Sequence, residues 1–171
     1  MKGYIQIYTG NGKGKTTAAL GLTLRAAGAE KKVFFAQFVK GQVSSEVKAL
    51  RQFIPSVEIR QYGLECYIRD TPTQTDIEAA RKGLKEVSDI IFSGKYDIVV
   101  LDEANIAIFY GLFTADELIE VLRQKSGETE IIITGRYAMP ELIAVADLVT
   151  EMQEVKHYYH QGVEARTGIE C

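Results

Sequence analysis

The segment YTGNGKGKTT, residues 8 to 17, places three glycines and two lysines within ten positions, directly after an apolar run and before an Ala- and Leu-rich stretch. Glycine allows backbone conformations that other residues avoid, so consecutive N–H groups in such a loop can converge on one anion. The N-terminus of a following helix adds partial positive charge at the same point. The segment therefore constrains the chain to a strand–loop–helix unit built around a bound anion.

This segment is close to the phosphate-binding P-loop pattern, which reads G-x-x-x-x-G-K-[ST] between a strand and a helix. The Gly-Lys-Thr run at 14 to 16 matches, whereas the first glycine is replaced by Thr9 and appears one position later. A flexible turn with solvated lysines is the alternative. In the P-loop interpretation Lys15 meets phosphate oxygens, Lys13 adds a second cation and the hydroxyl of Thr16 faces Mg²⁺. The residues predicted to bind the nucleotide in this loop are Gly10, Asn11, Gly12, Lys13, Gly14, Lys15, Thr16 and Thr17.

A second polar cluster is predicted where the apolar run IVVLDE ends in Asp102 and Glu103. A near-continuous apolar strand is typical of the centre of a parallel sheet that is covered on both faces. Nucleotide-binding sheets keep a metal-directing acid at such a strand end, so both acids are candidate Mg²⁺ residues together with Thr16. Adjacent residues on an extended strand point to opposite sides, so both can serve one ion only if the chain turns there. The alternative role of the pair is to cap the next helix.

Two further strand ends carry polar residues. The segment QFVKG supplies Gln37, Lys40 and Gly41, and ITGR supplies Thr134 and Arg136. Each alone is more often an ordinary loop residue than a ligand. Ligands of open α/β sheets bind beyond the carboxyl ends of the strands, and this shared location adds Arg136 to the predicted nucleotide-binding residues.

Apolar and polar segments alternate along the chain in a way that predicts its fold. Strands are predicted at 4–8, 33–38, 57–62, 96–104, 130–135 and 147–152, and helices at 15–30, 44–53, 75–93, 114–126 and after Pro140. This order favours an α/β, three-layer P-loop NTPase-like fold with a mostly parallel central sheet of about six strands. The chain contains no repeat, linker or low-complexity segment, so residues 1–171 are expected to form a single domain.

Composition narrows the classes of function. The net charge of −3 and the pI near 5.5 argue against a nucleic-acid partner, because phosphate backbones select basic surfaces. We expect no membrane association, since no apolar run could span a bilayer and no signal peptide is evident. Cys66 and Cys171 are too few and too far apart for a disulfide framework or a zinc site, and two free thiols favour the cytoplasm. His157 and His160 lack metal-ligand spacing and favour surface or structural roles.

The order of these motifs resembles the ATP:corrinoid adenosyltransferase family, whose members are built on a P-loop. The matching segments are TGNGKGKTTAA at 9–19, QFVKG at 37–41, VVLDE at 99–103, IITGR at 132–136, and VTEM, VKH and GIE in the closing stretch from 146 to 170. The resemblance covers nearly the whole chain. Its closing stretch is the most specific part, because a generic P-loop protein has no reason to carry it. The glycine loop of this family has the same departure from the general P-loop pattern as this chain, where Thr9 replaces the first glycine.

The resemblance implies transfer of the 5′-deoxyadenosyl group of ATP to a Co(I) corrinoid, with triphosphate as the leaving group, in adenosylcobalamin biosynthesis or salvage. Cobalt is the nucleophile, so the protein has to position the substrates and stabilise charge on the leaving oxygen. Lys15 and Lys13 are the catalytic candidates for that stabilisation. The resemblance also implies Mg²⁺ as cofactor, a homodimer, and a reductant protein as partner.

The corrinoid site is predicted in the loop after the third strand. Some relatives place a Phe and a Trp there, where they displace the lower axial ligand of cobalt and so make the metal easier to reduce. This chain has no Trp, and its loop YGLECYIRDTPTQ offers Tyr62, Tyr67 and Ile68 as corrinoid-binding candidates. Two other functions stay open at this point: a P-loop nucleoside kinase with Asp102 or Glu103 as base, and a non-catalytic ATP-binding module.

Overall fold

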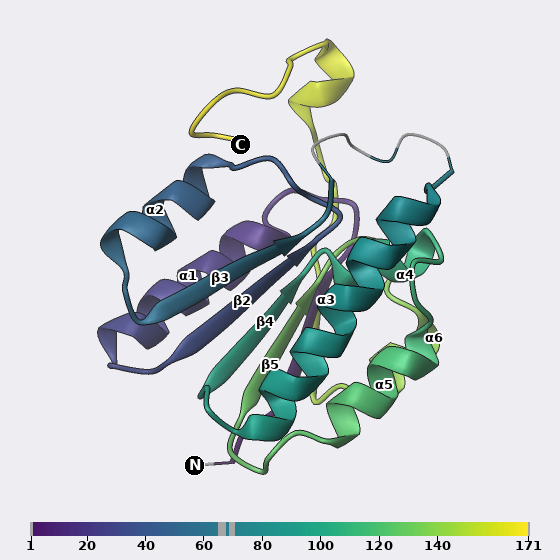
Figure 1. Cartoon of the computed structure of the whole chain (residues 1–171). Coiled ribbons are helices and arrows are strands. Elements are labelled where there is room, and N and C mark those ends of the chain that lie inside the picture. Colours follow the sequence, from purple (N-terminus) through teal and green to yellow (C-terminus); the bar gives the residue numbers. More distant parts are fainter. Residues whose placement is uncertain (1, 65–67, 69–70, 171) are drawn as a thin grey trace.

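The computed structural model describes residues 2–64, 68 and 71–170. Six strands form one sheet in the order β3-β2-β4-β5-β1-β6, and each neighbouring pair is parallel (Figure 1). The strands are β1 (Ile5–Thr9), β2 (Val33–Phe38), β3 (Val57–Tyr62), β4 (Ile98–Asp102), β5 (Glu130–Thr134) and β6 (Leu148–Glu151). The prediction of an α/β fold with a parallel sheet is confirmed.

Helices cover both faces of this sheet and give the three layers. One face carries α1 (Lys15–Gly28) and α2 (Ser45–Phe53), and the other carries α3 (Gln74–Ser93), α4 (Ala104–Phe109), α5 (Ala115–Arg123) and α6 (Pro140–Val145). After β6, the C-terminal segment runs past the carboxyl ends of the strands and includes the short 3-10 helix η1 (Tyr158–Gln161), drawn in yellow in Figure 1. Of the helices that the structure describes, none has both the length and the apolar content that a membrane span requires.

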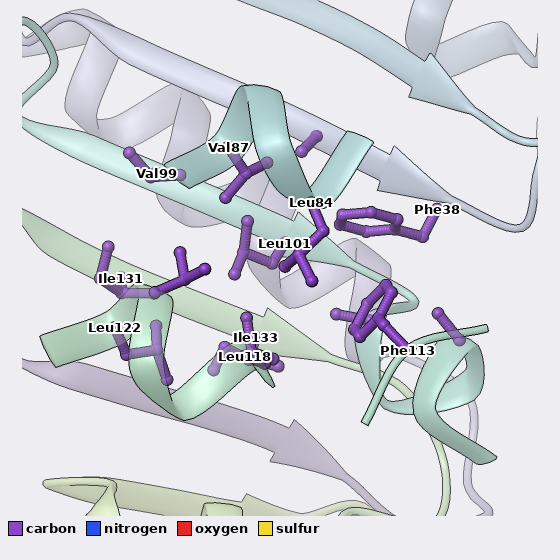
Figure 2. Close-up of a cluster of buried hydrophobic side chains, with 14 of the residues drawn as sticks. Phe38, Leu84, Val87, Val99, Leu101, Phe113, Leu118, Leu122, Ile131 and Ile133 are labelled. Atoms are coloured by element: carbon purple, nitrogen blue, oxygen red, sulfur yellow. The ribbon is translucent and has the colours of Figure 1, made fainter. Parts of the chain in front are cut away.

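The side chains of the strands alternate between two apolar clusters, one on each face of the sheet. The cluster under α3 to α6 includes Phe38, Leu84, Leu101, Leu118 and Ile133 (Figure 2). The cluster under α1 and α2 includes Ala19, Val47, Val100 and Ile132. The central strand β4 is buried along its whole length, as its near-continuous apolar run predicts. Both clusters hold the strands in register, so the strand ends reach the carboxyl edge together.

Most element ends lie within a few residues of the expectation, and the boundary after β4 is the difference that matters for the site. A strand is predicted through residue 104, but β4 ends at Asp102, Glu103 has a φ of 58°, and α4 begins at Ala104. The backbone N–H of Glu103 donates to Thr134 Oγ1 on β5 at 3.0 Å, which holds the chain in this turn. The segment that forms α4 is apolar and has no capping side chain, so its sequence does not predict a helix. The chain therefore turns between the two acids, the condition under which both could serve one ion.

Candidate active site

The carboxyl edge of the sheet holds a cavity of about 640 Å³. Parts of the chain that lie far apart in sequence line it together. These residues are Gly12, Lys13, Gly14, Lys15, Thr16, Thr17 and Leu20 around the first loop; Val39, Lys40, Ser45, Glu46, Ile68, Glu103, Ile106, Tyr110 and Arg136 beyond the other strands; and His157, Gly168, Ile169 and Glu170 in the C-terminal segment. The cavity thus brings together most of the predicted nucleotide-binding residues, including Arg136, while Gly10 and Asn11 lie in the loop outside its lining.

The loop between β1 and α1 depends on its glycines in two ways. Gly10 and Gly14 have φ values of 94° and 123°, in a region that side chains disfavour. Gly12 instead allows a close approach: its N–H donates to Met152 O at 2.7 Å, and a Cβ added to it would lie 2.7 Å from the carbonyl oxygen of Gln153. The C-terminal segment therefore braces the loop directly through the backbone.

Lys15 lies inside this loop rather than in solvent. It is only 8% exposed, and its Nζ donates to the carbonyl oxygens of Gly10 at 2.8 Å and of Gly12 at 2.7 Å. Burial lowers the pKa of Lys15, and the nearby charge of Arg136 lowers it further. Two positive groups thus face the same space at the N-terminus of α1, which is the arrangement that an anionic ligand stabilises.

Thr16, the first-turn hydroxyl of α1, is tied to the buried acid of β4. Thr16 Oγ1 donates to Asp102 Oδ1 at 2.8 Å. Asp102 is fully buried, and it also accepts from Thr134 Oγ1 at 2.7 Å and from Gln37 Nε2 at 3.0 Å. Residues from β1–α1, β2, β4 and β5 therefore converge on one carboxylate, which fixes the loop against the sheet.

Glu103 faces the cavity beside Asp102 because of the turn that follows β4. Burial raises the pKa of Glu103, and the charge of Asp102 raises it further, while Lys40 opposes the shift. Lys40 Nζ lies 3.7 Å from Glu103 Oε1 and 3.9 Å from Asp102 Oδ2. A γ-turn after β2 positions Lys40 near the two acids. In this turn Val39 has a φ of 66°, and Lys40 N–H donates to Phe38 O at 2.7 Å. The two carboxylates thus share a cationic partner.

The oxygens at this point fit a magnesium ion. Thr16, Asp102 and Glu103 present a hydroxyl and carboxylates, which are the hard donors that Mg²⁺ prefers. Within the described ranges, no group of three or more His, Cys, Asp or Glu side chains could hold a metal alone. Magnesium at a nucleotide needs only one or two carboxylates, because water and phosphate oxygens complete its shell. The donor set therefore fits Mg²⁺ that arrives with a phosphorylated ligand.

Lys13 points toward the C-terminal segment. Its Nζ donates to Tyr158 OH at 2.9 Å and pairs with Glu170 Oε1 at 2.8 Å, and Arg166 also pairs with Glu170. The side-chain hydrogen bond to Glu170 is the main reason that the pKa of Lys13 is raised. Residues of the closing segment thus form one wall of the cavity. The sequence marks this segment as family-specific but assigns it no role.

The cavity lining also includes Ile68, Ile106 and Tyr110, which are called the apolar wall here. Tyr110 OH donates to Ile68 O at 3.3 Å, so α4 is joined to the segment after β3. Of the predicted corrinoid residues, Ile68 is in this wall, and Tyr67 lies outside the described residues. Tyr62 is 7% exposed, stacks on Phe38 and packs against Gly83, a position that favours a structural role over the predicted contact.

The sequence did not predict two residues of this wall, Ile106 on α4 and Tyr110 directly after it. Ile106 and Tyr110 follow the acids by only a few positions, but the sequence predicts neither the turn at Glu103 nor the helix α4, which together place them in the cavity lining. His157, expected to have a surface or structural role, caps η1 by accepting from Tyr159 N at 3.1 Å and also lines the cavity. The signal in the sequence for this position is the closing VKH motif, which contains His157 and is part of the family resemblance.

The whole chain, residues 1–171, matches a family model described as ATP:corrinoid adenosyltransferase BtuR/CobO/CobP. A corrinoid adenosyltransferase from Pseudomonas aeruginosa is 34% identical over 170 residues, which cover 99% of this chain and 84% of that protein. The corrinoid adenosyltransferase CobA from Salmonella typhimurium is 34% identical over 172 residues, with 99% and 86% coverage. A corrinoid adenosyltransferase from Escherichia coli K12 is 32% identical over 176 residues, with 99% and 86% coverage. The similarity therefore spans the loop, the strand ends and the C-terminal segment alike.

Proposed function

The chain belongs to the ATP:corrinoid adenosyltransferase family, and on that premise we propose how the residues of its cavity divide the work of adenosyl transfer. The enzyme transfers the 5′-deoxyadenosyl group of ATP to the cobalt of a Co(I) corrinoid. The cobalt electron pair forms the Co–C5′ bond, the C5′–O bond breaks, and its electron pair leaves on triphosphate. The family membership disfavours the kinase and the non-catalytic binding module.

Lys15 and the loop amides hold the triphosphate, and they stabilise the charge that develops on its leaving oxygen. The observation that carries this assignment is the buried Lys15 ammonium within the glycine loop, hydrogen-bonded to the backbone carbonyls of Gly10 and Gly12, which an anion can replace. Arg136 lines the same cavity and adds a second positive charge. Lys13 serves the same anion once it leaves Glu170. Because cobalt is the nucleophile, positioning is the protein's main contribution, and correct orientation can be worth about 7–11 kcal/mol.

Thr16, Asp102 and Glu103 hold Mg²⁺ together with the phosphates. The support for this role is the set of hydroxyl and carboxylate oxygens at the end of β4, with two adjacent acids sharing Lys40. When bound, the ion neutralises phosphate charge and so favours triphosphate as a leaving group. Asp102 keeps the Thr16 hydroxyl oriented through their hydrogen bond.

Product analysis tests the reaction against its rivals. The protein is incubated anaerobically with Mg-ATP and chemically reduced cob(I)alamin, and the cobalt–carbon product is followed by absorbance while phosphorus NMR follows the by-product. Intact triphosphate should form in step with alkylated cobalt. Stoichiometric ADP or free phosphate would favour a kinase, and unchanged ATP would favour a binding module.

The partners expected from the family are part of the same proposal. A reductant protein supplies the electron that reduces Co(II) to Co(I), and Tyr67 with Ile68 excludes the lower ligand of cobalt. Tyr67→Ala should then cripple turnover when a protein reductant supplies electrons and largely spare it when the corrinoid arrives as Co(I). An equal loss in both assays would mean that Tyr67 does not act by excluding the lower ligand of cobalt.

A homodimer in the cytoplasm, with residues 1–171 as one domain, completes the proposal. The six strands of the described residues belong to one sheet, which supports the single domain. Exposed apolar residues on α6 and the edge strand β6, including Ile143, Val145, Leu148 and Val149, support association with a second copy. Sedimentation at micromolar concentration tests this, and a purely monomeric mass would contradict it.

A further inference from the structure

Two aromatic side chains stack on each other at the protein surface beside the cavity. The rings of Phe109, the last residue of α4, and Tyr137, in the segment between β5 and α6, lie 4.4 Å apart with 32° between their planes. Both are half exposed, at 51% and 48%. A stacked aromatic pair left open to water is costly unless something covers it, and exposed apolar surface of this kind marks binding sites.

This aromatic pair, Phe109 and Tyr137, is continuous with the apolar wall. Phe109 directly precedes Tyr110, which lines the cavity, and the two rings are 5.6 Å apart. Tyr137 directly follows Arg136, which also lines the cavity. Ile106 and Tyr110 in the cavity lining and the adjoining pair therefore form one series of neighbouring apolar and aromatic side chains.

The backbone of Tyr137 is held in a strained conformation. Its φ of 62° is unusual for a bulky residue, and backbone strain of this kind persists only where neighbouring contacts enforce it. Those contacts are present on both sides: Gly135 N–H donates to Tyr8 O at 3.2 Å, and Ala138 N–H donates to Thr9 Oγ1 at 3.3 Å. Strain of this kind gathers at ligand sites, where it presets the position of a side chain.

The two elements that carry the pair are also fastened to each other. Asn105 Nδ2 on α4 donates to Gly135 O at 3.1 Å, and a Cβ added to Gly135 would lie 2.9 Å from Asn105 Cβ. The φ of Gly135 is 131°, so this close contact requires glycine. Phe109 and Tyr137 are therefore presented on a rigid base and do not depend on a mobile loop.

The reaction requires a second substrate beside the nucleotide, and its chemistry suits this surface. A corrin is a broad macrocycle with large apolar faces, whereas the charged residues in the cavity lining, including Lys15, Arg136 and Glu103, suit the nucleotide. We propose that the Phe109–Tyr137 pair, continued by Ile106 and Tyr110, is the surface on which the corrin ring lies, which turns its cobalt toward C5′ of ATP. This inference rests on the proposed function, and it assigns the corrinoid site to α4 and the β5–α6 segment in addition to the loop after β3.

Direct binding tests this site without any turnover. Cob(II)alamin, which cannot accept the adenosyl group, is titrated anaerobically into the ATP complex of the wild type, Phe109→Ala, Tyr137→Asn and the double variant, and binding is followed by absorbance. Each single variant should weaken the Kd for cob(II)alamin about tenfold, equal to about 1.4 kcal/mol. The Kd for ATP should be unchanged. In turnover, KM for the corrinoid should rise while kcat at saturation changes little.

Two features of the variants separate binding from folding. Asparagine tolerates a positive φ better than tyrosine, so Tyr137→Asn should keep or raise the thermal midpoint while it loses corrinoid affinity. Phe92→Ala is the matched control, because Phe92 is 78% exposed near the end of α3, at the opposite edge of the sheet. It should leave both dissociation constants unchanged.

Three outcomes would overturn the corrin surface. The first is a double variant that binds cob(II)alamin within twofold of the wild type. The second is a parallel loss of ATP and corrinoid affinity. The third is an altered sedimentation coefficient with unchanged corrinoid affinity, which would make the pair a protein contact. None of these outcomes would contradict the proposed function as long as the wild type forms the adenosylated product. A wild type that forms no such product would contradict the proposed function instead.

Discussion

The two sides of the cavity are built in opposite ways. On the phosphate side, defined by Lys15, Thr16 and Asp102, each polar group is buried or half-buried and makes hydrogen bonds within 3 Å to neighbouring groups. On the apolar side, defined by the apolar wall and the Phe109–Tyr137 pair, side chains are partly exposed and held by packing. The phosphate side is thus preorganised for one kind of charge, while the apolar side offers area and shape.

This difference predicts separable kinetics. Polar groups aimed at developing charge act most strongly in the transition state, so their loss lowers kcat. Apolar contacts with a ring are made equally before and during reaction, so their loss raises KM. The four predictions below test whether the two sides separate in this way.

The largest effect is expected at Lys15. Lys15→Ala should lower kcat about 10²–10³-fold, equal to about 2.7–4 kcal/mol, by analogy with the loss of one oxyanion donor. The measurement is adenosyl transfer at saturating ATP, with the Kd for cob(II)alamin measured in parallel and expected to stay constant. Lys31→Ala, an exposed lysine paired with Asp97, is the control. Near-normal transfer by Lys15→Ala would remove the role given to the phosphate side.

Asp102 should come next, through magnesium. Asp102→Asn removes the charge while it keeps an oxygen for the Thr16 hydroxyl, and a change of this kind costs about 10–100-fold in metal affinity or activity. Transfer measured against Mg²⁺ concentration should shift to higher concentration, and chelation of the metal should suppress the wild type. Asp116→Asn, an exposed acid in the first turn of α5, should show no shift. Transfer that is independent of Mg²⁺ would contradict the proposed cofactor.

A pair of glycine variants tests how the C-terminal segment braces the phosphate side. Gly12→Ala forces a methyl group against the backbone of Met152 and Gln153, and overpacking of this kind costs about 1–3 kcal/mol. Both the free energy of unfolding and ATP affinity should fall. Gly21→Ala is the matched control in α1, where no atom lies within 4 Å, and it should stabilise the protein by about 0.5–1 kcal/mol. Equal behaviour of the two variants would mean that the brace contributes nothing.

The smallest effect is expected at Glu170, and it sharpens the place of Lys13. Glu170 holds Lys13 in an exposed ion pair, so Glu170→Gln should change ATP affinity only about two- to threefold and less at high salt. Lys13→Ala should weaken ATP binding and transfer clearly more, because it also removes a cation from the phosphates. If the two variants behave alike in titrations with ATP, Lys13 acts only through the C-terminal segment and belongs to neither side.

Local patterns were sufficient for much of the fold. The strands β2 and β3 lie where the apolar runs predict them, and α1 begins at Lys15 as the Gly-Lys-Thr run requires. The helix α4 was the exception, because its start depends on the hydrogen bond from Glu103 N–H to Thr134, more than thirty positions away in the chain. A pattern read within one segment cannot contain a contact of that range.

The amino-acid sequence alone was enough to identify the family and to predict the phosphate side. A phosphate-binding loop consists of consecutive backbone N–H groups and the residue types that permit them, and both can be recognised in a short segment. The direction of side chains required the folded chain. Tyr62 is part of the core because Gly83 of α3 leaves room for its ring, and Lys13 meets Glu170 because β6 returns beside β1. Phe109 and Tyr137 meet because Asn105 fastens α4 to the end of β5. Apolar contact depends on position in space and leaves no short motif, so only packing brings such residues together.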